Sequence, residues 1–234
     1  MEIEKLFFYS KGGLDKHWIY GSKLNYNLSC DFIQKLNYDY EDYSEYNNPE
    51  NIKSRKDVYY IVQLAVWIMD TYELFEKLIV PRLLINFVFS EESKNEFIKK
   101  YLKAIRSAIV AHPLSTNRHP DYGFNGDFIS IDIGFPRQQV FWNAFKYRTT
   151  IINLQGVVEE VDAEDCDFCI TGYRKNKGAE FYEHVGFNKA DIDGCVEFYK
   201  KKMNELDVYM KKLKKSNFYK EVQKYVENNK KYQE

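Results

Sequence analysis

Hydrophobic positions follow a helical period in two parts of the chain. Over residues 57–80 they return every three or four positions, and apolar side chains also lie off that stripe, which predicts a helix packed on most sides. Asp57 is placed to cap this helix and Pro81 to end it. A second amphipathic helix is predicted over 93–111, since Pro113 pushes the residue before it out of helical geometry.

A different pattern follows. Three segments rich in β-branched residues alternate or lie between turn residues, which is typical of strands: 127–133, 151–161 and 166–173. Helical spacing returns near Lys189. We therefore expect a mainly α fold, a helical bundle with a small β-containing insertion at about 127–173. We expect a single domain over 1–234. It contains core helices over 57–112, the insertion, and C-terminal helices over 189–234, the last of which spans 217–228.

The polar segment 37–56 is expected to be a loop, after a short helix over 29–36. It is rich in acidic residues and also carries four tyrosines, at positions 38, 40, 43 and 46. Because a loop cannot bury all four rings, we interpret these tyrosines as a contact surface.

Composition and charge exclude several classes of protein. The formal net charge is −1 and hydrophobic residues make up 44% of the chain, which excludes a wholly disordered protein and a bulk polyanion binder. No uninterrupted apolar run reaches the roughly 20 residues of a membrane span, and two acidic residues in the first four positions argue against a signal peptide. Four cysteines are too few for a disulfide framework, so we expect reduced thiols and a cytoplasmic protein without a membrane partner.

The C-terminal stretch differs in charge from the rest. Residues 199–234 contain eleven lysines against five acidic residues. Such a stretch either binds a polyanion such as RNA or is simply a solvated face.

The motif that carries chemistry lies at the end of the second helix, where Arg106 and His112 are separated by five residues and Ser107 follows the arginine. This arrangement resembles the signature of the HEPN superfamily, although the Asn that usually follows the arginine is absent. The resemblance implies a helical, commonly dimeric protein. It also implies either a metal-independent endoribonuclease of toxin–antitoxin or antiviral defence systems, or a relative that has lost catalysis.

The chemistry of RNA cleavage needs these residue types. A 2′-hydroxyl can attack the neighbouring phosphate if a group such as the His112 imidazole moves the protons. The Arg106 guanidinium stays charged and can hold the phosphate oxygens as negative charge develops. Arg106 and His112 are therefore the candidate catalytic residues, RNA is the expected substrate, and neither a metal nor another cofactor is required.

The spacing of Arg106 and His112 along a helix places a condition on this site. Six α-helical steps leave the two side chains about 120° apart around the axis and about 9 Å apart along it. One straight helix does not bring Arg106 and His112 together. Either His112 turns back at the helix end or a two-fold partner completes the site, so a homodimer is part of the hypothesis.

Neighbouring residues extend the candidate site. Ser107, Arg118 and His119 are candidates for substrate binding, although the loop that carries Arg118 and His119 could equally be a solvated turn. Cys166 and Cys169 form a CxxC pair without further ligands at zinc spacing, so we favour an alternating strand there. We interpret His17 and His184 as structural residues.

A second interpretation stays open beside the nuclease. The chain could be a non-catalytic helical module that binds a protein or a nucleotide in a defence or regulatory complex. An antitoxin or regulatory protein is an expected partner in either case. Ribonuclease assays on variants of Arg106 and His112 separate the two.

Overall fold

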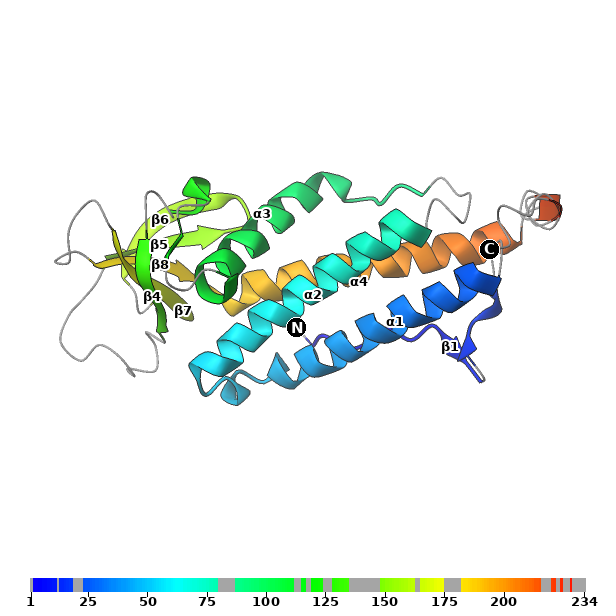
Figure 1. Ribbon diagram of the computed structural model, residues 1–234, viewed down its shortest axis with the longest axis horizontal. Coiled ribbons are helices and arrows are strands. Elements are labelled where there is room, and N and C mark those ends of the chain that lie inside the picture. Colours follow the sequence, from blue (N-terminus) through cyan, green and yellow to red (C-terminus); the bar gives the residue numbers. More distant parts are fainter. Residues whose placement is uncertain are drawn as a thin grey trace. The chain divides into compact units, whose positions relative to one another are not determined.

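The computed structural model describes residues 2–11, 13–18, 23–79, 87–111, 115–116, 119–123, 128–134, 148–162, 165–174 and 182–215, with positions 220, 221, 224 and 228. Helix is the main regular structure of these residues (Figure 1), as the hydrophobic pattern predicts. The chain divides into two compact units. Unit 1 contains residues 1–47, 67–92 and 196–234, and unit 2 contains residues 48–66 and 93–195.

The elements follow one another along the chain. The helices are α1 (Lys23–Ser44), α2 (Arg55–Ile79), α3 (Asn95–Arg106) and α4 (Lys189–Lys214). Two short strands, β1 (Tyr9–Ser10) and β2 (Gly13–Leu14), pair with each other. The remaining strands are β3 (Ser115–Thr116), β4 (Phe128–Gly134), β5 (Arg148–Asn153), β6 (Gly156–Asp162), β7 (Phe168–Arg174) and β8 (Tyr182–Phe187).

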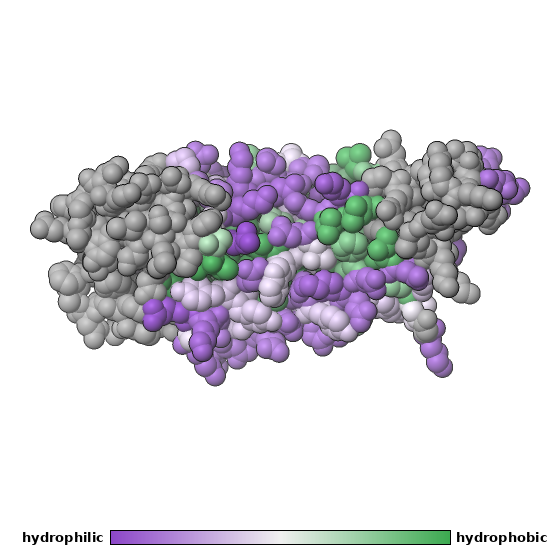
Figure 2. Space-filling view, viewed as in Figure 1, coloured by the Kyte–Doolittle hydropathy of each residue, from purple (hydrophilic) through white to green (hydrophobic). Residues whose placement is uncertain are grey.

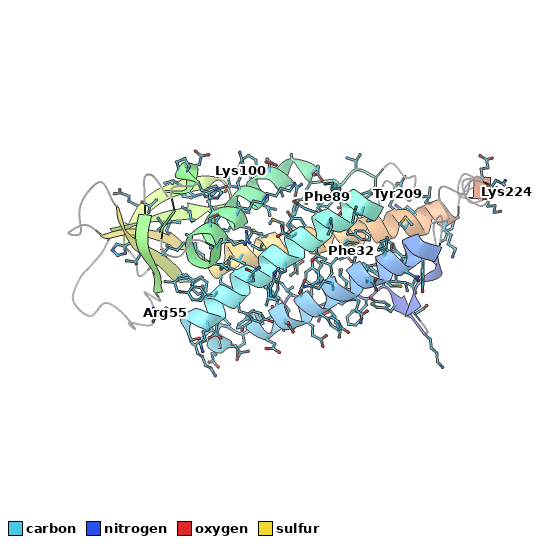
Figure 3. The ribbon with its side chains drawn as sticks, viewed as in Figure 1. Phe32, Arg55, Phe89, Lys100, Tyr209 and Lys224 are labelled. Carbon is cyan, nitrogen blue, oxygen red and sulfur yellow. The ribbon has the colours of Figure 1, made fainter. Side chains whose placement is uncertain are left out.

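Aromatic side chains form much of the core of unit 1. Phe32 points from α1 toward α2 (Figure 3), and its ring centroid lies 5.7 Å from that of Phe75. Tyr72 of α2 lies 5.7 Å from Tyr199 of α4, again between ring centroids. These edge-to-face and tilted pairs contribute about 0.5–1.5 kcal/mol each beyond the area that they bury. The tyrosine and phenylalanine excess in the sequence is therefore largely a packing feature.

The expectation of a polar loop after residue 36 is wrong, because α1 continues to Ser44. Ile33, Leu36, Tyr40 and Tyr43 recur at helical spacing and are all almost fully buried. Charged residues on the opposite face obscured this stripe, and the phenol rings count as apolar when they are packed. Of the four tyrosines, only Tyr38 is strongly exposed, at 56% of its surface. Because Tyr40 and Tyr43 belong to the core, they cannot be part of the expected contact surface.

In unit 2 the start of α2 is capped by Asp57, as predicted. Its carboxylate accepts hydrogen bonds from the backbone N–H groups of Lys53 and Ser54, at 2.9 and 2.7 Å, and from Ser54 Oγ at 2.9 Å. These bonds satisfy donors that a helix N-terminus leaves open. Asp57 performs this role from the first turn of the helix, two residues after its start at Arg55.

The sheet of unit 2 has the strand order β3-β4-β7-β8-β5-β6. Only β5 and β8 pair in parallel; the other pairs are antiparallel. Phe168 of β7 pairs with Phe187 of β8, and their rings lie 5.2 Å apart. The sequence prediction missed β8 and joined the region of β5 and β6 into one strand. A turn at residues 154–155 separates them, and Gly156 then adopts φ 113°, which glycine reaches without strain.

Helix α3 buries a face of Ile98, Tyr101, Leu102 and Ile105. Phe97 of the same helix is half exposed. The helix begins at Asn95, after a 3₁₀ turn and two residues later than predicted, and it has no side-chain cap. The helical region does end near Ala111, as Pro113 predicted.

One lysine of the basic C-terminal stretch belongs to the core of unit 1. Lys202 of α4 is fully buried, with Nζ 2.9 Å from Glu92 and 3.5 Å from Glu76. Most of the last predicted helix, 217–228, lies outside the described residues. None of the helices that the structure describes carries an apolar stretch long enough to cross a bilayer.

Candidate functional site

Arg106 is the last α-helical residue of α3, and a π-helical segment, η6 (Ser107–Ala111), follows it directly. Burial of the apolar α3 face fixes the helix, and η6 lies against β3 and β4. In a π-helix each turn is wider because hydrogen bonds join residues five positions apart, and such segments are frequent at functional sites. The backbone therefore changes its geometry at the residue after the candidate arginine.

This segment corrects the sequence-based geometry. The separation of about 120° and about 9 Å assumed an α-helix throughout, whereas five residues after Arg106 are π-helical. His112 and Arg118 lie outside the described residues, so the positions of these two candidates stay predictions. The described part of the site consists of Arg106, Ser107 and His119.

The structure brings Ser107 and His119 together. Ser107 Oγ lies 3.1 Å from His119 Nε2, although the residues are 12 positions apart. Ser107 is buried, and His119 is half-buried. A hydroxyl can donate to a neutral imidazole nitrogen or accept from a protonated one, so this contact is compatible with both charge states of His119.

The backbone at His119 is held in an uncommon conformation. His119 has φ 66°, the left-handed region, and it is the only residue other than glycine with positive φ in the described part of the chain. Such a conformation costs on the order of 1–3 kcal/mol and persists only where the surroundings enforce it. Pro120 follows and begins the 3₁₀ turn η7 (Pro120–Tyr122).

Tyr122 anchors that turn. Its hydroxyl lies 3.5 Å from the carbonyl oxygen of Phe97 on α3 and 3.4 Å from that of Leu154 in the β5–β6 turn. Its ring lies 6.1 Å from the ring of Tyr101. Burial, with a smaller contribution from Asp121, raises the pKa of Tyr122 to about 12, so the phenol remains a hydrogen-bond donor at neutral pH.

Gly123 closes the turn against the sheet. It adopts φ 77°, and a Cβ there would lie 3.4 Å from the side chain of Val185 on β8. That distance is an ordinary van der Waals contact, so the left-handed backbone is what favours glycine here. Together, Tyr122 and Gly123 fix the chain immediately after His119.

The Arg106 guanidinium has an open hydrogen-bonding position. Its Nε is buried and has no hydrogen-bond partner among the described residues. A guanidinium keeps its charge at any accessible pH, and a buried unpaired donor costs about 1–3 kcal/mol, or more when charged. A guanidinium can hold an anion such as a phosphate through two parallel N–H donors.

Within the described residues, no group of three or more His, Cys, Asp or Glu side chains could hold a metal ion. Cys166 and Cys169 are buried, and Phe168 and Cys169 lie in β7, where an alternating strand was expected. Cys195 is also buried. Burial, followed by repulsion from Asp191 and Asp193, raises the pKa of the Cys195 thiol well above its ordinary value, so it is not a reactive thiolate.

The two remaining histidines have structural partners. His17 Nε2 lies 2.6 Å from Asp207, and His184 Nδ1 lies 3.0 Å from the hydroxyl of Thr171 on the neighbouring strand. Sequence reasoning missed Tyr122 and the π-helical segment, because neither the anchoring contacts nor the change in helix type leaves a local sequence signal.

Comparisons with known proteins add no relative: the chain matches no family model, no curated protein and no solved structure.

Proposed function

We propose that this protein is a metal-independent endoribonuclease of HEPN type, with a helical bundle as its catalytic framework. The observation that supports the proposal is the Ser107–His119 hydrogen bond at the end of α3, one residue after Arg106, whose buried Nε has no hydrogen-bond partner among the described residues. An arginine, a serine and a histidine at one helix end are residue types suited to a phosphodiester, which offers anionic oxygens and requires proton transfer.

In this proposal Arg106 holds a phosphate oxygen and stabilises the negative charge that develops on it. His112 removes the proton of the 2′-hydroxyl, whose oxygen then attacks phosphorus. The bond from phosphorus to the 5′-oxygen breaks, and the 5′-oxygen takes up a proton. The products are a 2′,3′-cyclic phosphate and a 5′-hydroxyl. The reaction consumes RNA and not DNA because only RNA carries the 2′-hydroxyl.

The wider setting of the proposal is a cytoplasmic toxin or antiviral defence protein. It would act as a homodimer, and an antitoxin or another regulatory protein would restrain it. Arg118 would contact the substrate backbone together with Ser107 and His119.

Incubating the purified protein with single-stranded RNA in EDTA tests this function. The set comprises wild type, Arg106→Ala, His112→Ala and a control, Lys103→Ala, which removes an exposed cation from the same helix. Wild type and the control should cleave RNA at equal rates, leave a matched DNA intact and yield cyclic phosphate ends. The Arg106 and His112 variants should lose at least about 100-fold, the lower end for a proton-transfer group. Equal background cleavage by all four proteins would overturn the proposal.

A second candidate function is the non-catalytic binding module. It is favoured by a groove of about 420 Å³ in unit 1, lined by Leu28 and Phe32 of α1 and by Leu74 of α2, with Asp31 and Asp70 among its lining residues. Leu74 is 48% exposed, and Figure 2 shows hydrophobic side chains gathered over the C-terminal part of α2. Background-level cleavage by wild type, together with a ligand whose binding Leu74→Lys abolishes, would favour this function.

A further inference from the structure

We propose that His119, positioned by Ser107, is the general acid of the site: it protonates the leaving 5′-oxygen while His112 acts as the base. The inference rests on the proposed function and adds a catalytic residue to it. The motif of Arg106 and His112 alone provides one titrating group, whereas in-line cleavage of RNA needs one proton removed and another delivered.

Placement is the first argument. Ser107 directly follows Arg106 in the chain, and its Oγ lies 3.1 Å from His119 Nε2. The His119 imidazole therefore lies at the same helix end as Arg106. His119 is half-buried, so the ring is accessible to a ligand, while the Ser107 hydroxyl that holds it is buried.

Rigidity is the second argument. The left-handed backbone of His119 is uncommon for a residue with a side chain, and strain of this kind clusters at functional sites. The anchoring of Tyr122 between α3 and the β5–β6 turn keeps the strained residue in place. A solvated turn would relax to a less strained conformation, so the surroundings of His119 favour a defined position for the imidazole.

Proton balance is the third argument. The protonated imidazole gives its proton to the 5′-oxygen as the bond from phosphorus to that oxygen breaks, and it is left neutral. His112 meanwhile takes the proton of the 2′-hydroxyl and becomes charged. Because Nε2 faces Ser107, the proton is delivered from Nδ1, and Nε2–H donates to Ser107 Oγ both before and after the transfer, so Ser107 positions His119 throughout. Exchange with water restores both histidines.

The test compares two substrates that differ only in the leaving group. One is the dinucleotide uridylyl-(3′→5′)-adenosine, whose 5′-oxygen must be protonated. The other is uridine 3′-(4-nitrophenyl phosphate), whose nitrophenolate leaves without a proton. His119→Asn is the principal variant, because asparagine tolerates the left-handed conformation but does not titrate in the relevant range. His119→Ala, His112→Ala, Arg106→Ala and Lys103→Ala complete the set, and circular dichroism with thermal melting checks the fold of each.

We expect His119→Asn to cleave the dinucleotide about 100- to 10,000-fold more slowly than wild type, the usual range for loss of an acid or base. On the nitrophenyl ester it should remain within about tenfold of wild type. His112→Ala and Arg106→Ala should be slow on both substrates. With the dinucleotide, the wild-type rate should fall at high pH, where His119 loses its proton, and this alkaline limb should disappear in His119→Asn.

Variants of Ser107 test its positioning role separately. Ser107→Ala should lower kcat on the dinucleotide and displace the alkaline limb, with little effect on the nitrophenyl ester, and Ser107→Thr should restore both because it keeps the hydroxyl. A purely structural role would affect both substrates equally.

Two failures are distinguishable. If wild type cleaves neither substrate above the Arg106→Ala background, the proposed function fails. If wild type cleaves both and His119→Asn loses both equally, or loses neither, the nuclease stands and the assignment of His119 as general acid is overturned.

Discussion

His17 Nε2 lies 2.6 Å from Asp207 Oδ1, although 190 positions separate the two residues in the chain. The same oxygen accepts a hydrogen bond from Trp18 Nε1 at 2.9 Å, and the other carboxylate oxygen lies 2.6 Å from Lys211 Nζ. Asp207 is only 3% exposed. With these three donors, the buried carboxylate of Asp207 connects the N-terminal segment to α4. Removing it therefore tests how much this cluster contributes to the stability of unit 1.

Replacing Asp207 with alanine should therefore destabilise the protein strongly. The change leaves the buried His17 and Trp18 donors without their acceptor, a loss of about 3–5 kcal/mol by analogy with broken buried pairs. Asp207→Asn keeps an acceptor oxygen and should lose less. Urea unfolding followed by circular dichroism measures both, and an unfolding free energy of Asp207→Ala equal to that of wild type would contradict the role of this cluster.

Removing the buried Lys202 should not destabilise the protein, in contrast to removing Asp207. Its Nζ lies over the rings of Tyr72, Phe89 and Phe198, at 5.1, 5.6 and 5.7 Å from their centroids, and it is paired with Glu92 and Glu76. The two glutamates remain partly exposed, so they would regain water if the lysine were removed. Apolar replacement of a whole buried ion pair is often neutral or stabilising, by up to about 4 kcal/mol, and the same is expected here because water can solvate the two glutamates.

Lys202→Met should accordingly unfold at a free energy equal to that of wild type or higher. The matched control is Lys201→Met, which removes a half-exposed lysine from the neighbouring position and should change stability by less than about 1 kcal/mol. Denaturant unfolding compares the three proteins. A loss of more than about 2 kcal/mol in Lys202→Met would show that the cation and its aromatic neighbours are net stabilising.

Asp57 should make the stability of the α2 start depend on pH. Burial alone would raise the pKa of this carboxyl, but the hydrogen bonds donated by Lys53 and Ser54 outweigh it and hold the pKa below the ordinary value of 3.8. A lowered pKa in the folded protein means stability that is fully present above 3.8 and is lost as the pH falls through the folded value.

Asp57→Ala should thus cost about 1 kcal/mol at pH 7, the usual value for a helix cap. Its deficit relative to wild type should shrink as the pH is lowered below 3.8. Thermal unfolding at a series of pH values measures the difference. A deficit that stays constant into the acid range would mean that the charge of Asp57 contributes nothing to the cap.

Tyr122 connects stability to the proposed activity. Tyr122→Phe keeps the ring against Tyr101 and loses only the hydroxyl contacts, so it should cost about 1 kcal/mol and retain RNA cleavage. Tyr122→Ala creates a cavity, which should cost about 3–5 kcal/mol and release the segment that carries His119. Unfolding and cleavage assays on the same preparations separate the two effects. Full activity in a folded Tyr122→Ala would show that this anchor does not position His119.

Local pattern determined a large part of the helical structure. The three-and-four spacing of Ile61, Leu64 and Ile68 identifies α2, and the spacing of Val196, Tyr199 and Met203 identifies α4; all six side chains are buried. These elements can be predicted because the period of an amphipathic helix is a property of neighbouring residues. The placement of Arg106 at the end of a helix also follows from local signals.

The tertiary structure decided the rest. It buried Tyr40 and Tyr43, which turned an apparently polar segment into the second half of α1, and it added β8 to the sheet. The same is true of the site, where the 3.1 Å contact of Ser107 with His119 depends on a left-handed residue and on the anchoring of Tyr122. Contacts between residues far apart along the chain fix these features, because their energy comes from burial and hydrogen bonds that exist only once the chain is folded.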